Sequence, residues 1–296
     1  MNSARQTRGL TGSWDSFWDC LDAQMVSLYT RGRLKTIHQF WQRCYAEDLW
    51  ACMGTRASEA SCLELGAGRG STSMYLTSNG CDVTMLDLSG AGFEVAKSNF
   101  AAEGLKLPAL VQADARHTEL PSESFDCVFS IGLLEHFEDP RPVLAEAVRL
   151  LRPGGLHFAV IIPDRSDEIR RFAYTFFRPW SLVWALMPRS LKNLLKPPRR
   201  SSDYAGRELM RTAYSRMDYV KMLDGLDITD ARCVPYNPYH SVYNTPFLET
   251  YLTIPAYRFH RGIKRTWASH PLLATWSSLA SCDLLTFRKR QGRSRE

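Results

Sequence analysis

Residues 61–70 read Ser-Cys-Leu-Glu-Leu-Gly-Ala-Gly-Arg-Gly, a short apolar run that ends in three glycines at alternate positions. The apolar run is typical of a buried strand, and the glycines predict a tight loop directly after it. Glycine adopts positive φ without steric cost and lets a ligand approach the backbone. The stretch therefore predicts a backbone-lined nucleotide pocket at the end of a strand.

Apolar runs alternate with helical segments from residue 61 onward, over short connections. Gly80, Gly104 and the Pro153-Gly154-Gly155 turn are expected to end the helices, because glycine accepts a left-handed cap and proline cannot continue the helix. The alternation predicts an α/β fold with a doubly wound, mostly parallel sheet. The strands expected from it are 61–65, 81–86, 109–113, 125–130 and 156–162, and the expected helices between them are about 71–78, 92–102 and 141–151. The alternation stops after residue 162, and 282–288 is expected as a last strand.

Polar side chains lie at the ends of four of these strands: Glu64, Asp87, Asp114 and Ser130. Ligands of doubly wound sheets bind outside the carboxyl ends of the strands, where the connections diverge to opposite faces. Each aspartate also has a plainer interpretation, as a cap on the end of its strand. The four together indicate a polar ligand at this edge of the sheet.

The spacing of the glycines helps to distinguish a dinucleotide from other nucleotide-like ligands. A dinucleotide-binding loop, Gly-x-Gly-x-x-Gly, would put its third small residue at Ser71, whereas the third glycine here is Gly70. Glu64, beside the loop, would repel a pyrophosphate and suits a cationic ligand. Asp87 follows the loop by about twenty residues and can accept from both ribose hydroxyls of either kind of nucleotide.

The motifs that follow decide between these nucleotides. Their order and spacing resemble class I S-adenosylmethionine-dependent methyltransferases, particularly the group that includes the ubiquinone and menaquinone biosynthesis enzymes. The resemblance covers about residues 61–163 and is weaker at 214–235 and 282–289. The motifs are Gln112-Ala113-Asp114-Ala115, Phe125-Asp126-Cys127-Val128-Phe129-Ser130, Leu134-Glu135-His136 and Leu151-Arg152-Pro153-Gly154-Gly155.

This resemblance implies S-adenosylmethionine (SAM) as the cofactor, a Rossmann-like fold with a seven-stranded sheet, and a set of binding residues. Residues 214–226 resemble the helix before the sixth strand, and 227–236 resemble that strand. Asp87 would hold the ribose, Leu88 would lie against the adenine, and Asp114 would accept from the adenine amine, with the Ala115 amide at a ring nitrogen. Ser130 would act mainly through its backbone, near the amino-acid end. The residues implied to line the methionine and ribose end are Glu64, Gly66, Ala67, Gly68 and Gly70.

His136 is the candidate catalytic residue. A hydroxyl acceptor is a poor nucleophile until its proton leaves, and an imidazole suits that task. Two interpretations stay open, a catalytic base and a residue that orders the cofactor site, whereas Glu135 is expected to organise the loop. Residues 130–133 read Ser-Ile-Gly-Leu instead of the Asn-Pro-Pro-Tyr associated with amino-group methylation. We interpret Asn237-Pro238-Tyr239 as a turn, so oxygen is preferred as the acceptor atom.

The segments around the 61–162 core predict further elements. Residues 1–60 are expected to form a helical cover, because apolar residues between 14 and 50 recur at spacings of three and four with a break near Gly32. These helices either pack on the sheet or close over bound cofactor. A helical insertion or lid is expected at 163–213, and the end of the core sheet at 214–289 with a second insertion at 237–281. A basic tail is expected at 290–296, and the insertions are where acceptor specificity should lie.

Residues 172–187 are very apolar and aromatic, and a basic cluster follows them at Lys192, Lys196, Arg199 and Arg200. This stretch is too short and interrupted to cross a bilayer. It predicts either peripheral contact with an anionic membrane through residues 172–200, or a lid packed on the sheet.

Charge is divided unevenly along the 296 residues, whose formal net charge is +6. Lys and Arg number 14 against 19 Asp and Glu up to residue 162, and 23 against 12 from residue 163 onward. The basic part favours an anionic partner or is a solvated face. The eight cysteines include no Cys-x-x-Cys pair, which predicts reduced thiols and no metal site. The first twenty residues lack the apolar run of a signal peptide, which predicts a cytoplasmic protein. It would be membrane-associated if residues 172–200 dock on a membrane.

The sequence thus predicts a SAM-dependent methyltransferase of a small or lipid-like acceptor. One rival is a SAM-binding partner protein that transfers no methyl group. Another is a nucleic-acid methyltransferase, which rests only on positive charge and lacks the acceptor motif. The oligomeric state stays open.

Overall fold

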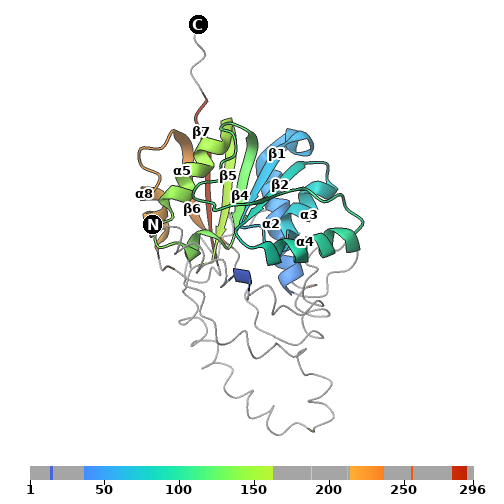
Figure 1. The fold of residues 1–296 in the computed structure, drawn as a ribbon. Helices are drawn as coiled ribbons and strands as arrows, with labels where there is room; N and C mark the ends of the chain where they lie inside the picture. Colours follow the sequence, from blue (N-terminus) through green and yellow to red (C-terminus); the bar gives the residue numbers. More distant parts are fainter. Residues whose placement is uncertain are drawn as a thin grey trace, which may run out of the picture.

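A computed structural model describes residues 14–15, 37–162, 188, 212, 214–236, 255 and 282–291 of the chain (Figure 1). Its centre is a seven-stranded sheet of order β3-β2-β1-β4-β5-β7-β6, in which only β7 runs antiparallel to its neighbours β5 and β6. The predicted fold class is therefore confirmed. The strands are β1 (Ser61–Leu65), β2 (Asp82–Asp87), β3 (Ala109–Gln112), β4 (Phe125–Ile131), β5 (Leu151–Ile161), β6 (Ile228–Tyr236) and β7 (Cys282–Lys289).

Helices cover both faces of the sheet. On one face α2 (Ile37–Met53), α3 (Ser71–Ser78) and α4 (Gly90–Ala102) pack on a core that includes Phe100 and Phe129. On the other face α5 (Arg141–Leu150) and α8 (Arg216–Lys221) pack on a second core that includes Leu63 and Tyr219. Two one-sided cores separated by a sheet explain why the buried strands are apolar on both sides.

The two windings of the chain diverge between β1 and β4, which are neighbours in the sheet although two strands separate them in sequence. The connection after β1 runs through α3 and the connection after β4 runs through α5, on the opposite face. Such a switch point leaves the carboxyl ends of the two strands open to a ligand. The polar strand ends predicted from the sequence all lie along this edge.

The second predicted N-terminal helix is confirmed as α2, which packs against α3 and β5 on the face of the sheet. It is tied to the far strands, because the Tyr236 hydroxyl donates to Asp48 Oδ2 at 2.7 Å. The first predicted helix lies outside the described residues except for the helical pair Trp14 and Asp15. The lid at 163–213 and the insertion at 237–281 lie almost wholly outside them, as do the turn at 237–239 and the membrane-docking stretch.

Residues 153–155 were predicted as a turn that closes the helix at 141–151, and this prediction is wrong. They belong to the first part of β5, which begins at Leu151 and carries a bulge: Phe125 pairs with Leu151 and Cys127 already pairs with Leu156. Gly155 is required there, because a Cβ would lie 2.8 Å from the Arg152 carbonyl oxygen. The bulge lies at the amino end of β5, so it shapes the sheet at the end away from the candidate site.

The remaining strand and helix bounds differ from prediction by at most two residues, except that α8 covers only six of the thirteen residues expected to be helical. A capping box between Ser215 and Asp218 starts α8. The short helix η2 (Gly54–Glu59), between α2 and β1, was not predicted. Within the described residues, no helix is both long enough and apolar enough to cross a membrane.

Candidate functional site

The glycine loop after β1 lies in close contact with the strands beside it. Gly66 and Gly70 have φ of +67° and +69°. A Cβ would lie 2.7 Å from Leu133 Cδ1 at Gly66, and 2.6 Å from Met85 Cε at Gly70. Both glycines have positive φ, and the positions that a Cβ would take are occupied by Leu133 and Met85, so glycine lets the loop backbone pack closely against these side chains at the switch point.

Asp87, the last residue of β2, holds the glycine loop. Its Oδ2 accepts from the Gly68 amide at 2.7 Å, and its Oδ1 accepts from the Ser89 amide at 2.8 Å. Burial raises the pKa of Asp87, while these amide hydrogen bonds oppose the rise. A carboxylate has about four acceptor positions, so Asp87 can also accept from a ribose diol.

Glu64 belongs to β1, just before the glycine loop, and its side chain lies on the face of the sheet that α3 covers. Its Oε2 accepts from the Ser73 hydroxyl at 2.5 Å and from the Ser73 amide at 3.3 Å, in the first turn of α3. Burial raises the pKa of Glu64 to about 8. The carboxyl thus links β1 to the start of α3, and its predicted place in the lining of the cofactor pocket stays a prediction.

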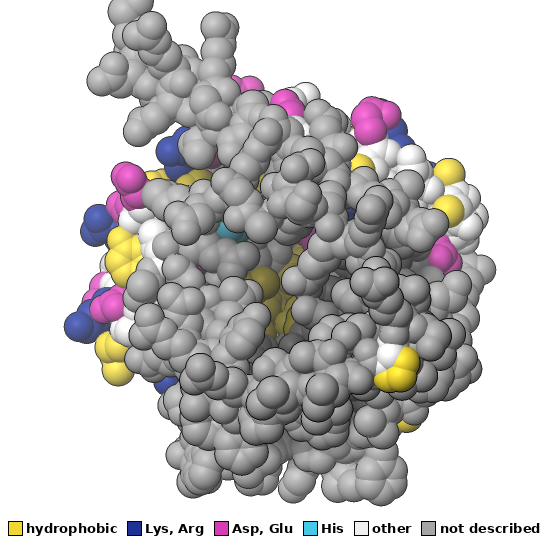
Figure 2. Space-filling view, turned by 90° about the horizontal axis from the view of Figure 1, so that it is seen from below, with side chains coloured by type: hydrophobic (Ala, Val, Ile, Leu, Met, Phe, Trp, Pro, Cys, Tyr) yellow, Lys and Arg dark blue, Asp and Glu magenta, His cyan; other side chains and the backbone are white. Residues whose placement is uncertain are grey.

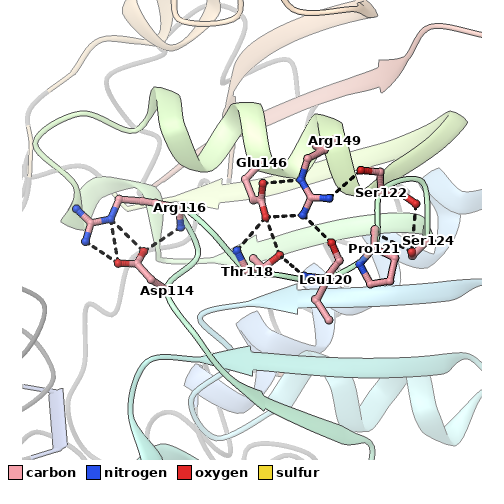
Figure 3. Close-up of polar contacts among 9 residues, drawn as sticks. All are labelled: Asp114, Arg116, Thr118, Leu120, Pro121, Ser122, Ser124, Glu146 and Arg149. Atoms are coloured by element: carbon pink, nitrogen blue, oxygen red, sulfur yellow. Dashed lines mark hydrogen bonds and ion pairs between the residues drawn. The ribbon is translucent and has the colours of Figure 1, made fainter. Parts of the chain in front are cut away.

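Asp114, just after β3, is held by an arginine that the sequence analysis missed. Arg116 donates from its amide to Asp114 Oδ1 at 2.9 Å and from Nη2 to Oδ2 at 2.6 Å (Figure 3). Partial burial raises the pKa of Asp114, but the hydrogen bonds and charge of Arg116 more than compensate and hold it below its usual value. The Arg116 guanidinium also lies over the ring of Phe137, at 5.9 Å. An Asp-x-Arg spacing directly after a strand is the signal that could have identified the pair.

The loop that carries Asp114 is fixed to α5 by a second ion pair. Glu146 Oε1 accepts from the Thr118 amide at 2.9 Å and hydroxyl at 2.7 Å, and Arg149 Nη2 donates to the same oxygen at 2.8 Å (Figure 3). Arg149 also donates to the Leu120 carbonyl oxygen at 2.7 Å. The hydrogen bond from Arg149 is the main cause that lowers the pKa of Glu146 to about 2. The charged network therefore fixes the position of the whole β3–β4 connection.

The end of β4 carries Ser130 and leads to the one-turn helix η3 (Leu134–His136). Ser130 Oγ is buried and makes no hydrogen bond within the described residues. Glu135 is buried, and its carbonyl oxygen accepts from the Thr212 amide at 2.7 Å. His136 is half-buried, and its ring meets the ring of Trp14 edge to face with centroids 5.0 Å apart.

The other predicted cofactor residues lie at the same edge. The Ala67 amide donates to the Leu86 carbonyl oxygen at 3.0 Å, and the Leu88 carbonyl oxygen accepts from Gln112 Nε2 at 3.2 Å. Ala115 is buried next to Asp114. Figure 2 views this edge and shows hydrophobic side chains near its middle with a histidine beside them. The strand order and these contacts define a Rossmann-like domain, the class of fold in which a nucleoside is expected at the β1–β4 switch point.

Comparisons with known proteins agree with this class. Residues 63–159 match the family described as a methyltransferase domain. The chain is 36% identical over 135 residues to malonyl-(acyl-carrier protein) O-methyltransferase of Enterobacter lignolyticus, covering 45% of this chain and 51% of that protein. It is 30% identical over 177 residues to ubiquinone biosynthesis O-methyltransferase of Pseudomonas fluorescens, covering 60% of this chain and 68% of that protein. It therefore spans about half the length of the first relative and two thirds of the second.

Solved structures share the fold at low identity. The cyclase SpnF superposes with a TM-score of 0.52 at 17% identity, covering 88% of this chain and 84% of that chain. Phosphoethanolamine N-methyltransferase 2 of Haemonchus contortus, solved in complex with SAM, gives 0.50 at 17% identity, covering 83% of this chain and 52% of that chain. The chain belongs to the class I SAM-dependent methyltransferases.

The residues at the switch point fit the cofactor of this family. Asp87 accepts from the backbone amides of Gly68 and Ser89 and has acceptor capacity left for a ribose diol. The unpartnered Ser130 hydroxyl is a further group that a polar ligand could satisfy. Site residues from β1, β2, β3 and β4 thus lie along one edge, as the sequence predicts, while their individual contacts with SAM stay predictions.

Proposed function

We propose that this protein transfers the methyl group of SAM to a hydroxyl group of a small or lipid-like acceptor. The observation that carries the proposal is the position of His136. It stands half-buried on η3 at the switch point, and Leu133, just before η3, lies against Gly66 of the glycine loop. A titratable imidazole therefore lies beside the loop on which the cofactor is expected.

Methyl transfer to a hydroxyl group requires that the acceptor oxygen is positioned against the methyl group of SAM and that the hydroxyl loses its proton. Bound SAM supplies a methyl group on a positively charged sulfur, which a nucleophile attacks in line from about 3 Å. The loop and Asp87 hold the nucleoside end, and His136 accepts the hydroxyl proton at one ring nitrogen as the acceptor oxygen becomes nucleophilic. The edge-to-face contact with Trp14 limits rotation of the imidazole.

Oxygen is supported as the acceptor atom by the O-methyltransferase names of both relatives, and a lipid-like acceptor by the ubiquinone biosynthesis of one of them. The aromatic and basic composition of residues 172–200, outside the described residues, supports the same class and peripheral contact with an anionic membrane. Vesicle partition of the protein, compared with a variant lacking the charges of Lys196, Arg199 and Arg200, tests the membrane contact. Equal, salt-insensitive partition of the two would argue against it.

Methyl transfer needs its own test, because the same fold occurs in a protein named as a cyclase. SAM binding is measured by calorimetry. Transfer is then measured from methyl-labelled SAM to a lipid extract, to an aqueous extract and to RNA. Tight SAM binding without transfer to any fraction would favour a non-catalytic SAM-binding partner, and transfer to RNA with salt-sensitive binding would favour a nucleic-acid methyltransferase.

The role of His136 is tested by His136→Gln, with the exposed His117→Gln as the matched control. We expect SAM affinity within about twofold of wild type and turnover lowered by about 10² to 10⁴ at neutral pH. For a phenolic acceptor, turnover of His136→Gln should recover by up to tenfold per pH unit as the acceptor ionises in solution. Unchanged turnover would assign His136 to ordering the site.

A further inference from the structure

Two carboxylates meet at one serine beside the glycine loop, although they are far apart in sequence. The Ser89 hydroxyl donates to Asp15 Oδ1 at 2.5 Å, and the Ser89 amide donates to Asp87 Oδ1 at 2.8 Å. Ser89 also caps α4, because its hydroxyl oxygen accepts from the Gly92 amide at 3.3 Å. Asp15 therefore sits at the end of β2, next to the residue predicted to hold the ribose.

Trp14, the neighbour of Asp15, contacts the other side of the switch point. Its ring meets the ring of His136, which follows β4, at 5.0 Å and 85°. Strand β1 lies between β2 and β4 in the sheet, so the dipeptide reaches from one neighbour of β1 to the other, a span of about 9–10 Å. Figure 1 shows this short dark-blue segment at the lower edge of the sheet, below the ends of the central strands.

We propose that Trp14 and Asp15 are positioning residues of the SAM site, with Asp15 facing the ribose hydroxyls and Trp14 orienting the His136 imidazole. The proposal rests on the proposed function, since it assumes SAM on the glycine loop. Two carboxylates around one serine repel each other unless a ligand places hydrogen-bond donors or positive charge between them. A ribose diol supplies two donors, which gives Asp15 and Asp87 one each.

The burial of Asp15 and its neighbours supports this assignment. Asp15 and Trp14 are half-buried, although Asp15 carries a carboxyl group that is ordinarily exposed. Asp15 also raises the pKa of Asp87, after the larger effect of burial, so the two carboxylates interact in the ligand-free protein. The contacts with Ser89 and with His136 come from adjacent residues. Because β1 lies between β2 and β4, they extend the dipeptide across the carboxyl end of β1, from which the glycine loop begins.

Calorimetry of Asp15→Asn with SAM and with S-adenosylhomocysteine, which lacks the positive charge, tests the ribose assignment. Asparagine keeps an acceptor for Ser89, so the ligand-free protein should unfold at the wild-type temperature. We expect both ligands to bind about 10-fold to 100-fold more weakly, because both carry the ribose diol. The exposed Asp82→Asn, at the other end of β2, is the matched control and should bind both ligands as wild type does.

The outcomes separate this inference from the function on which it rests. If wild type binds neither ligand, both are overturned. If wild type binds and Asp15→Asn binds equally well, this inference alone fails. A loss for SAM without a loss for S-adenosylhomocysteine would assign Asp15 to the positive charge and overturn the ribose assignment.

Trp14 is tested by a spectroscopic signature. In histidine-labelled protein the His136 ring signal, identified by its absence in His136→Gln, should shift in Trp14→Leu because the ring current of the indole is lost. SAM affinity of Trp14→Leu should stay within about threefold of wild type, since Trp14 acts through His136 rather than on the nucleoside. An unchanged His136 signal would overturn the role assigned to Trp14.

Discussion

Replacing Glu64 with glutamine should remove a pH dependence from the stability of the ligand-free protein. The Glu64 carboxyl is fully buried, and its pKa rises from an ordinary value of 4.5 to about 8. Between these two values the folded chain keeps a proton that the unfolded chain releases. The folded state therefore binds more protons, and its stability falls as pH rises through this window.

The size of the effect follows from the shift. Each pKa unit corresponds to about 1.4 kcal/mol, so Glu64 alone should lower the free energy of unfolding by on the order of 4–5 kcal/mol between about pH 4.5 and about pH 8. Glu64→Gln keeps an oxygen to accept from Ser73 and carries no titrating proton. The stability difference, variant minus wild type, should therefore grow steadily from acid to mildly alkaline pH.

Urea unfolding at pH 5, 6, 7 and 8 measures this difference, and subtraction removes groups common to both proteins. Glu59→Gln, at the exposed end of η2, is the matched control for the loss of one surface carboxyl group. A Glu64→Gln curve parallel to wild type would refute the reasoning, because Glu64 would then be ionised in the folded protein. The two hydrogen bonds from Ser73 would in that case be enough to stabilise the ionised Glu64 carboxylate without a ligand.

Two further predictions concern the loops of the site. Gly70→Ala should lower the free energy of unfolding by about 2–4 kcal/mol and weaken SAM binding, because a strained φ combines with a clash against the buried side chain of Met85. Gly104→Ala, at φ +63° with no atom within 4 Å, should lower it by only about 1–2 kcal/mol. Equal losses in urea unfolding would argue against the steric part of this reasoning. Arg149→Met should cost about 1–3 kcal/mol, since it removes the charged partner of buried Glu146, and should also weaken SAM binding through the Asp114 loop. Arg152→Met, which removes an exposed ion pair, should cost under about 1 kcal/mol and leave SAM affinity unchanged, and calorimetry with both variants checks the contrast.

The sequence predicted the sheet and the edge at which ligands bind, because strand and helix periods, glycine stops and polar strand ends are local signals. Helix α3 was predicted at its observed bounds. The bulge at the start of β5 was mistaken for a turn, since Pro-Gly-Gly is a local turn signal and only pairing with β4 keeps it extended. Helix α8 was predicted too long, because its apolar spacing continues past the residue where the helix ends.

The residues of the candidate site, like the fold, include some that a local pattern predicts and some that it does not. Asp87, Asp114 and Ser130 could be identified because each is the polar end of its own apolar run. The partner of Asp114 is also local, because Arg116 follows it by two residues. Asp87, however, accepts from Gly68, 19 residues earlier on another element, and its neighbour Ser89 meets Asp15, 74 residues earlier, and no local pattern predicts these two contacts. A sequence pattern shows which residue ends a strand but not which distant group it meets.

This difference assigns separate tasks to the two halves of the site. The loop after β3 is held by charged and buried contacts within the core domain, Asp114 by Arg116 and Thr118 by Glu146, which suits a nucleoside that is the same for every member of the family. At the end of β2, Asp15 reaches Ser89 from outside this core. On the β4 side the contacts come from outside the 61–162 core, Thr212 at Glu135 and Trp14 at the imidazole. Segments outside the core can change without disturbing the nucleoside pocket. Acceptor choice should therefore depend on the β4 side, where those segments meet His136.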